Sequence, residues 1–350
     1  MNTPPSIRQL AAIAGVSRTT VSLALRNHPS IAAKTRARIQ EIATAHGYIQ
    51  DPVISSLMNK LRVGRSNRPG EKLAFLTMWP NLKDWKALCQ ADRNYYHYFE
   101  GARERAAMLG YDLEVFVGKG AGMTARRLSN ILYTRNIRGL IIPGVPQPRG
   151  HLSLDWEHFA CVALSHTVFK PDLDRVSHFH FEGMMLALRR LKQYGYKRIG
   201  YANTIDQDER GHHGWVAAYL AYQQTHPDEC KIPPFFEKKW NAKIFNAWVR
   251  DNALEVVISN WLLPTDKARQ AGIEVPPGVS YVSLDIQDDN LDESTALIAG
   301  VDQQAKTLGM TAVDVVVSHI QRSDFGLPAN PKITHLGGVW RDGATLLKKR

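Results

Sequence analysis

Residues 6–48 read SIRQLAAIAGVSRTTVSLALRNHPSIAAKTRARIQEIATAHGY, and this stretch predicts three short helices. In the first helix, Ile7, Leu10, Ala11 and Ala14 recur at helical spacing, so that their side chains share one face. Gly15 then interrupts the pattern, because glycine favours the left-handed conformation that ends a helix. A turn through the next residue should lead into the second helix.

The second predicted helix begins at Ser17, whose side-chain oxygen can accept a hydrogen bond from a backbone N–H of the first turn. Val21 and Leu25 lie four residues apart and should face the first helix. Arg18 and Thr19 therefore point outward at the start of this helix. With Ser17 as the N-cap, the side chains of Arg18 and Thr19 remain available for contacts with other molecules.

The third predicted helix runs from about Lys34 to Ala45, buries Ile39 and Ile42, and ends at Gly47. A helix, a glycine-containing turn and a second helix that starts with small polar and basic residues form the helix-turn-helix plan. In that plan the second helix enters the major groove of DNA, and its first residues contact base edges. On periodicity alone, an ordinary helical subdomain is an equal alternative.

The charge distribution favours the DNA-binding alternative. Residues 1–70 contain 10 Lys and Arg against 2 acidic residues, a net charge of +8, whereas the whole chain has a net charge of +11. The other 280 residues therefore contribute only +3. A basic excess confined to the predicted helix-turn-helix is typical of phosphate binding.

The motifs AGVS at 14–17, TVS at 20–22 and KTR at 34–36 resemble, at matching spacing, the headpiece of the LacI/GalR family of bacterial transcription repressors. The resemblance implies a cytoplasmic, sequence-specific transcription regulator. It would act as a repressor on a near-palindromic double-stranded operator, bind it as a homodimer, and respond to a small-molecule effector such as a sugar or related metabolite. Two heads reading two half-sites also require a dimer.

The helix-turn-helix plan assigns roles to the headpiece residues. We expect base-edge contacts from Arg18, Thr19 and, at a position often polar in the resembling family, Leu23, which could touch a thymine methyl. Phosphate contacts that fix the register are expected from Ser6, Ser22, Arg26, Asn27, Thr35 and Arg36.

Residues 51–70 are predicted to form a short helix followed by a linker. Asp51 is a suitable N-cap, and Pro52 occupies the first helical position, where proline is favoured. In the resembling family a hinge helix stands here and inserts a leucine into the minor groove at the central base step. Leu57 falls at that position, and an apolar wedge that kinks the duplex is a known device. The alternative for Leu57 is a linker residue that packs on the body.

From residue 71 onward, short apolar runs alternate with amphipathic stretches, which predicts parallel sheets covered by helices on both faces. The resemblance implies a periplasmic-binding-protein-like α/β body of two Rossmann-like lobes after the all-α headpiece of residues 1–50. We place lobe 1 at about 71–178 and 302–328, and lobe 2 at about 179–301 and 329–345. The body of residues 71–350 would hold the effector and form the dimer.

An effector should bind at the carboxyl ends of the strands, between the lobes. Aromatic residues follow the first strand, and we expect Trp79 and Tyr96 to stack on a ligand ring, although packing in the core or a dimer is an equal alternative. The resemblance adds the positions His178, Arg210, Asn260, Trp261 and Asp285. Arg210 lies one residue before the position of the family's ligand-binding arginine, which is Gly211 here.

No enzyme motif is present, since the chain lacks GxxxxGK[ST], GxSxG, HExxH and a GxGxxG fingerprint with the required spacing. We therefore expect no catalytic residue, no cofactor and no metal; the pairs His178/His180 and His212/His213 lack the helical spacing of a zinc site. No signal or membrane-spanning segment is evident, and three distant cysteines are typical of a reducing cytoplasm. Two alternatives are an architectural DNA-binding protein without an effector and, less favoured, a solute-binding protein.

Overall fold

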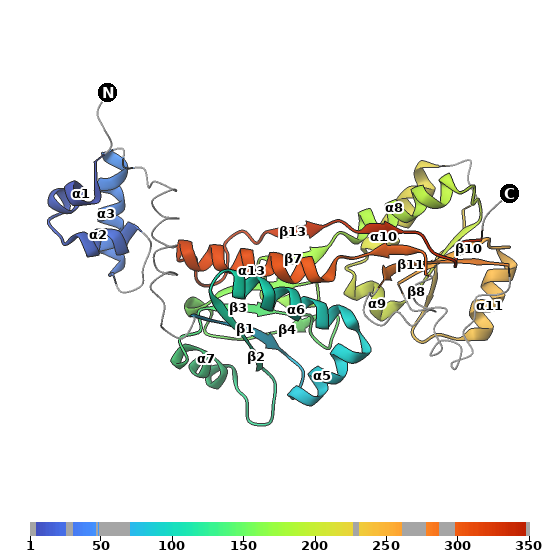
Figure 1. Ribbon diagram of the computed structural model, residues 1–350, viewed down its shortest axis with the longest axis horizontal. Helices are drawn as coiled ribbons and strands as arrows, with labels where there is room; N and C mark the ends of the chain where they lie inside the picture. The colour runs from blue at the N-terminus through green and yellow to red at the C-terminus, as the bar shows by residue number, and fades with distance from the viewer. Residues whose placement is uncertain are drawn as a thin grey trace.

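The computed structural model describes residues 5–25, 31–46, 48, 71–226, 231–260, 278–286 and 298–347 (Figure 1). It contains a helical headpiece and a body of two parallel-sheet lobes. Among these residues, no helix combines the length and the apolar character needed to cross a membrane.

The headpiece consists of α1 (Ile7–Ala14), α2 (Arg18–Leu25) and α3 (Ala33–Ala45). Its core is formed by Leu10, Val21 and Ile39, each at most 1% exposed. On α3 the second buried residue is Ala43 rather than Ile42, because a position four residues after Ile39 returns to the same face of the helix. The predicted end of the third helix, at Gly47, lies outside the described residues.

Lobe 1 contains a six-stranded sheet in the order β13-β7-β5-β3-β1-β2, in which every neighbouring pair is parallel. Its strands are β1 (Glu71–Thr77), β2 (Tyr111–Val117), β3 (Gly139–Ile142), β5 (Ala160–Leu164), β7 (Arg175–His178) and β13 (Ile333–Leu336). The helices of this lobe are α5 (Leu82–Ala91), α6 (Arg93–Met108), α7 (Ala125–Thr134) and α13 (Ala305–Arg322). The short pair β4 (Gly150–His151) and β6 (Val168–Lys170) and the 3-10 helix η1 (Trp156–His158) complete it.

Lobe 2 contains a six-stranded sheet in the order β14-β12-β11-β10-β8-β9. Its strands are β8 (Ile199–Thr204), β9 (Phe235–Glu237), β10 (Val256–Ser259), β11 (Ser280–Ile286), β12 (Gly300–Asp302) and β14 (Val339–Arg341). The helices are α8 (His180–Gln193), α9 (Ile205–Arg210), α10 (Gly214–Thr225) and α11 (Ala242–Asp251). Only β14, at the edge, pairs antiparallel among the described strands of this sheet.

Each sheet carries an apolar cluster on both faces, as expected for parallel strands whose connections cross over the sheet. In lobe 1 one cluster joins the sheet to α6 and α13 and includes Phe75 and Val313, whereas the other joins it to α7 and includes Leu132. In lobe 2 the two clusters face α8 with α10 and α11, respectively. The two lobes therefore have separate hydrophobic cores.

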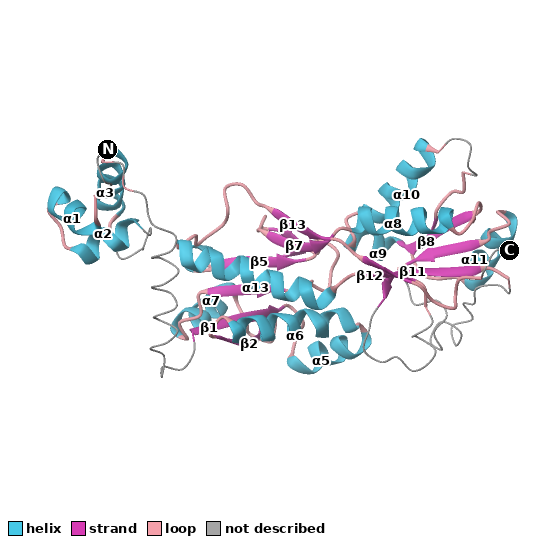
Figure 2. Ribbon diagram, turned by 45° about the horizontal axis from the view of Figure 1, so that its top comes forward, coloured by secondary structure: helices cyan, strands magenta, loops and turns pink. Residues whose placement is uncertain are grey.

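The chain passes between the lobes three times: from β7 to α8, from β12 to α13, and from β13 to β14 (Figure 2). The last passage consists only of Gly337 and Gly338. These crossings bring residues from distant parts of the sequence to one junction between the lobes, at the carboxyl ends of the strands.

Helices α6 and α13 approach each other closely because glycines stand at their contact. A Cβ atom on Gly101 would lie 2.0 Å from the backbone oxygen of Lys306, and one on Gly309 would lie 2.1 Å from that of Tyr98. No side chain fits at either distance. The contact positions the start of α6, which reaches the junction.

Several short elements of the body carry too little sequence pattern to be recognised in advance. Helix α5 follows β1, and helix α9 follows β8; Asn81 and Thr204 cap them through hydrogen bonds to backbone N–H groups. Such polar residues are ambiguous in sequence, since they favour caps and turns alike. Strands β7, β12, β13 and β14 have only three or four residues each.

Candidate DNA-binding surface and interlobe site

The headpiece turn is built by local caps. Gly15 adopts the left-handed conformation, with φ of 66°, and ends α1. Ser6 and Gln9 form a capping box at the start of α1, in which the Ser6 N–H donates to Gln9 Oε1 at 2.7 Å. At the start of α2, the Thr20 N–H donates to Ser17 Oγ at 3.1 Å. These bonds fix where each helix begins, and so which residues lie on the first turn of α2.

Two hydrogen bonds from α3 hold the other two helices in place. Arg38 donates from Nη2 to the Ala14 carbonyl at 3.1 Å, and Gln40 donates from Nε2 to the Ala24 carbonyl at 3.1 Å. Each satisfies a carbonyl in the last turn of a helix, where intrahelical donors are lacking. Sequence reasoning missed this role, since spacing along α3 gives no indication of what lies opposite.

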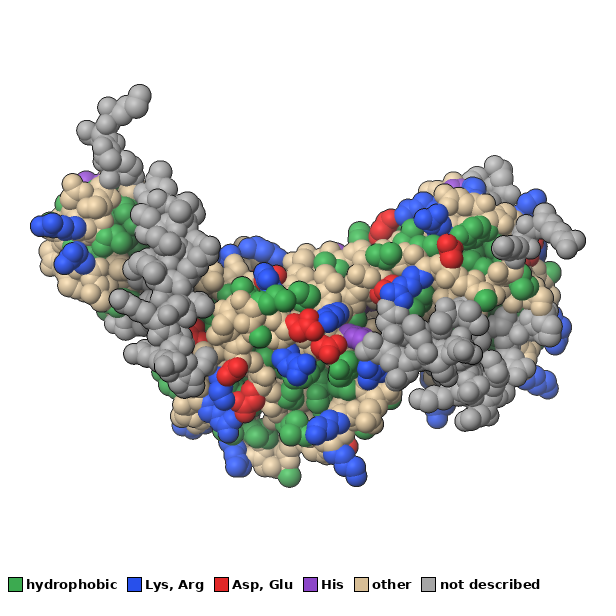
Figure 3. Space-filling model, viewed as in Figure 1, with side chains coloured by type: hydrophobic (Ala, Val, Ile, Leu, Met, Phe, Trp, Pro, Cys, Tyr) green, Lys and Arg blue, Asp and Glu red, His purple; other side chains and the backbone are tan. Residues whose placement is uncertain are grey.

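The residues predicted to contact DNA differ in how exposed their side chains are in the structure. Arg18 and Thr19 are exposed on the first turn of α2, whereas Leu23, Ser22, Thr35 and Arg36 are half-buried. Ser6 has its side chain engaged in the capping box. Arg26, Asn27 and Leu57 lie outside the described residues. Figure 3 shows Lys and Arg side chains along the outer edge of the headpiece.

Replacing Ser17 with alanine should lower the stability of the headpiece by about 1 kcal/mol, because the cap to Thr20 is lost. Urea unfolding followed by far-UV circular dichroism measures the change. Thr19→Ala, at an exposed position of the same helix, is the matched control and should leave stability within about 0.5 kcal/mol. Equal losses in both variants would contradict the capping role.

At the interlobe junction, the start of α6 contacts the end of β11. Asn94 is held by the Asp92 cap and donates two hydrogen bonds from Nδ2 to the carboxylate of Asp285, at 3.0 and 2.8 Å. Asn94 is itself 8% exposed. The predicted ligand-binding residue Asp285 therefore links the two lobes, through a partner 191 positions away.

Arg210 also links the lobes. Its Nε donates to Asp206 Oδ2 at 2.8 Å within α9, and its Nη1 donates to the Val145 carbonyl of lobe 1 at 3.1 Å. Nη2 donates to the neighbouring Pro146 carbonyl. The guanidinium predicted to hold a ligand thus holds the loop after β3.

His178 lies at the end of β7 and is 5% exposed. Its Nε2 is hydrogen-bonded to the Tyr98 hydroxyl at 2.7 Å. Burial lowers the pKa of His178 to about 4 and raises the pKa of Tyr98 well above its ordinary value. Both side chains are therefore neutral near pH 7, so this contact is a hydrogen bond between uncharged groups.

The other predicted effector residues are dispersed. Trp79 packs in an aromatic cluster with Trp85 and Tyr95, at ring distances of 6.0 and 5.5 Å. Tyr96 lies on a different side of α6 from Asn94 and donates to Glu100 at 3.0 Å. Asn260 follows β10, and its Oδ1 is buried without a hydrogen-bond partner among the described residues. Trp261 lies outside them.

Acid should destabilise the protein through His178. Because its folded pKa is about 4, the unfolded chain binds more protons between about pH 6.5 and about pH 4. The stability that neutral His178 contributes to the folded state is therefore complete above about pH 6.5 and is lost as the pH falls through this window. Urea unfolding at a series of pH values measures the slope, which should be smaller in His178→Gln. His158→Gln, at a half-exposed surface histidine, is the control; an unchanged slope in His178→Gln would contradict the prediction.

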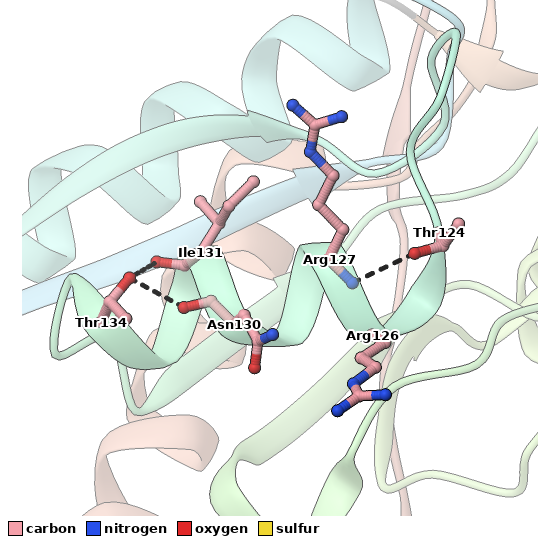
Figure 4. A pocket seen from close by; sticks show the side chains of 6 residues that line it. All are labelled: Thr124, Arg126, Arg127, Asn130, Ile131 and Thr134. Atoms are coloured by element: carbon pink, nitrogen blue, oxygen red, sulfur yellow. Dashed lines mark hydrogen bonds between the residues drawn. The ribbon is translucent and has the colours of Figure 1, made fainter.

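A separate hollow lies on the surface of α7 (Figure 4). It is an open depression of about 360 Å³, lined by Thr124, Arg126, Arg127, Asn130, Ile131 and Thr134. The lining comes from one helix and its cap, and it includes no residue predicted to bind DNA or an effector. Polar side chains of this hollow bond mainly within α7 itself.

The comparisons with known proteins agree with this arrangement. The family model described as "Bacterial regulatory proteins, lacI family" matches residues 6–51, the helix-turn-helix. No curated protein matches the chain.

Solved structures match over nearly the whole chain. The transcriptional regulator CelR in complex with cellobiose is 17% identical with a TM-score of 0.52, covering 97% of this chain and 99% of that one. The lac repressor dimer bound to operator and the anti-inducer ONPF is 17% identical with a TM-score of 0.50, covering 98% and 99%. A LacI family regulator from Enterococcus faecium with bound ribose is 15% identical, with a TM-score of 0.51 over 80% and 100%.

At these identities the structures show a shared fold: a helical headpiece followed by two parallel-sheet lobes. The family match covers the headpiece, residues 6–51. The headpiece therefore resembles the DNA-binding domain of bacterial regulatory proteins of the lacI family, and the whole chain shares the fold of solved regulators.

Proposed function

We propose that this chain is a transcription regulator, which binds a near-palindromic operator as a homodimer and represses transcription from it. The supporting observation is the capped start of α2, which presents Arg18 and Thr19 to solvent on a basic headpiece. An arginine there can pair bidentately with a guanine in the major groove. We expect the protein to be cytoplasmic and to have no enzymatic activity.

We further propose that a small molecule bound between the lobes modulates DNA affinity. The solved relatives named above hold cellobiose, ONPF or ribose. In this chain, Asn94–Asp285 and the Arg210 contacts with lobe 1 join the lobes, so a ligand that changes these contacts would shift the equilibrium between lobe arrangements. The residues before the body, with Leu57 as minor-groove wedge, would transmit that shift to the headpiece.

The experiment that tests this function is the selection of bound sequences from a random duplex library at two salt concentrations. A two-fold symmetric motif with a defined central step is the expected result. Binding without any motif and with a steep salt dependence would instead mean that the headpiece only neutralises phosphates. The architectural alternative would then replace the proposal.

A further inference from the structure

Strands β7 and β13 are paired and lie side by side close to where the chain passes between the lobes (Figure 2). Five histidines gather around the ends of these strands. They are His166, His178, His180, His212 and His335, which we call the junction histidines. The ring of His166, from lobe 1, stacks on that of His212, from lobe 2, at 5.0 Å. Ser177 Oγ is hydrogen-bonded to His166 Nε2 at 3.0 Å and to His335 Nδ1 at 3.1 Å. The cluster therefore joins both lobes.

The backbone places His212 against His166 at a conformational cost. His212 and His213 have φ of 53° and 59°, the left-handed region that residues with a Cβ rarely adopt. This conformation is energetically unfavourable for residues with a Cβ, and such strain concentrates at ligand sites and switches. Two successive strained residues at a lobe-to-lobe contact make this turn a candidate for function.

The second half of the cluster contains polar atoms without partners. His178 and His180 rings lie 5.7 Å apart, and His180 lies 4.0 Å from the indole of Trp215. Among the described residues, Trp215 Nε1 and His180 Nδ1 are buried without a hydrogen-bond partner, and Trp215 is 4% exposed. An indole N–H can only donate, so it requires an acceptor from elsewhere. Unsatisfied buried groups of this kind are rare without a ligand, ion or water.

Two helices begin at the same place. Helices α8 and α10, of 14 and 12 residues, start at His180 and Gly214 without a side-chain cap, whereas α6, α7, α9 and α11 have one. Their first backbone N–H groups lack intrahelical acceptors and carry the positive end of the helix dipole. The N–H of Gly214 already donates to the Gly211 carbonyl, at 3.1 Å. The two starts touch, since a Cβ on Gly214 would lie 2.9 Å from His180 Cβ.

Most acceptors beside the junction are engaged by protein donors, and Asp208 Oδ1 is buried without a hydrogen-bond partner among the described residues. Three carboxylates beside the junction accept hydrogen bonds from protein donors, in the pairs Asp206–Arg210, Asp208–His213 and Asp285–Asn94. The groups facing His166 are Arg175, His178, His212 and His335, and those facing His180 are His166, His178 and His335. The cluster is therefore rich in donors and in groups that can become positive.

We infer that the junction histidines, with Trp215 and the starts of α8 and α10, bind a small ligand through an oxyanion group, carboxylate or tetrahedral, and that binding is accompanied by proton uptake. This inference rests on the proposed function, since it names the chemical class of the effector. The proposed anionic ligand differs from the neutral sugars cellobiose and ribose that two of the solved relatives hold. An anion supplies only acceptors, which the Trp215 N–H and the uncapped starts of α8 and α10 can use.

Proton uptake follows from the state of the imidazoles without a ligand. Burial, Arg175 and the neighbouring histidines lower the pKa of His166 to about 3, and burial with the neighbouring histidines lowers that of His180 well below its ordinary value. A bound anion favours the protonated form and raises these pKa values. Affinity should therefore increase as the pH falls, by up to about tenfold per pH unit for each proton taken up.

The test is isothermal titration of the full chain with sulfate, malonate and ribose, at about pH 8 and about pH 6, on either side of the ordinary histidine pKa. A chelator in every buffer excludes metal binding as the source of heat. We expect sulfate or malonate to bind at least about tenfold more tightly at the lower pH. Buffers of different ionisation enthalpy measure the protons taken up, and the two anions distinguish a tetrahedral from a carboxylate group.

Variants locate the binding. His212→Gln and Trp215→Phe should each weaken anion binding at least about tenfold, the loss expected when one charge-assisted hydrogen bond is removed. His158→Gln, away from the junction, should have no effect. Ribose binding without anion binding, a pH-independent affinity, or equal loss in all three variants would overturn the inference. Operator selection is measured without these ligands, so its outcome separates a failure here from a failure of the proposed function.

Discussion

Replacing Arg18 with alanine should relax base preference at one position of each operator half-site and cost about 1–3 kcal/mol on the preferred sequence, roughly 5- to 150-fold in affinity. Arg18 is exposed on the first turn of α2, the turn that the helix-turn-helix plan directs at base edges. The loss should be small on sequences that already lack the preferred base, because the side chain makes no specific contact there.

The matched variant is Arg36→Ala, at the half-buried start of α3, where a phosphate contact is expected. It should weaken binding to all sequences alike and reduce the dependence of log Kd on log salt by about one unit. Fluorescence anisotropy on the selected operator and on single-base variants, at several salt concentrations, measures both. If the two variants lose affinity equally across all sequences, the assigned roles are wrong.

Gly101→Ala should lower the stability of lobe 1 by at least about 1–3 kcal/mol, because the added methyl group overpacks the contact between α6 and α13. The added methyl group would lie 2.0 Å from the Lys306 carbonyl oxygen, which belongs to the backbone and cannot rotate away. Helices α6 and α13 must then separate. Asn94 lies two turns before Gly101 on the same face of α6, so its hydrogen bonds to Asp285 should weaken as well.

A glycine-to-alanine substitution should instead increase stability where the structure has room for the added methyl group. Gly183 lies inside α8, and a Cβ there would meet its nearest neighbour, Val301 Cγ1, at 3.8 Å, an ordinary contact. Gly183→Ala should therefore stabilise the protein by up to about 1 kcal/mol, through helix propensity. Urea unfolding of the full chain measures both variants. A gain in stability for Gly101→Ala would show that α6 and α13 do not depend on this close approach.

The headpiece could be predicted from sequence because its boundaries are marked by local chemistry. Gly15 and Ser17 act within a few residues of their own positions, as a left-handed C-cap and an N-cap, and their effects are visible in the spacing alone. The alternation of short apolar runs with amphipathic stretches, which predicts the parallel sheets of the body, could also be recognised in the sequence. Strand ends that share one edge of a parallel sheet could be expected to meet. The positions His178 and Asp285 were indicated by the resemblance to the family.

What the sequence could not reveal were partners brought together by the crossings. Asp285 finds Asn94, which lies 191 positions away, and Arg210 finds the Val145 carbonyl, a backbone atom that carries no sequence signal. His335 belongs to a strand of only four residues, too short to be recognised, and its approach to His166 depends on β13 pairing with β7. The junction histidines were therefore visible in the sequence as separate residues and not as a cluster.

The order of the strands also bears on synthesis. Strands β13 and β14 follow every other strand in the sequence and complete the edges of two different sheets, with two glycines between them. During translation, neither sheet can be completed until this segment has left the ribosome, and both are then completed almost at once. We expect ribosome-bound chains that stop before residue 333 to be protease-sensitive in both lobes, so that the regulator becomes competent in a single late step.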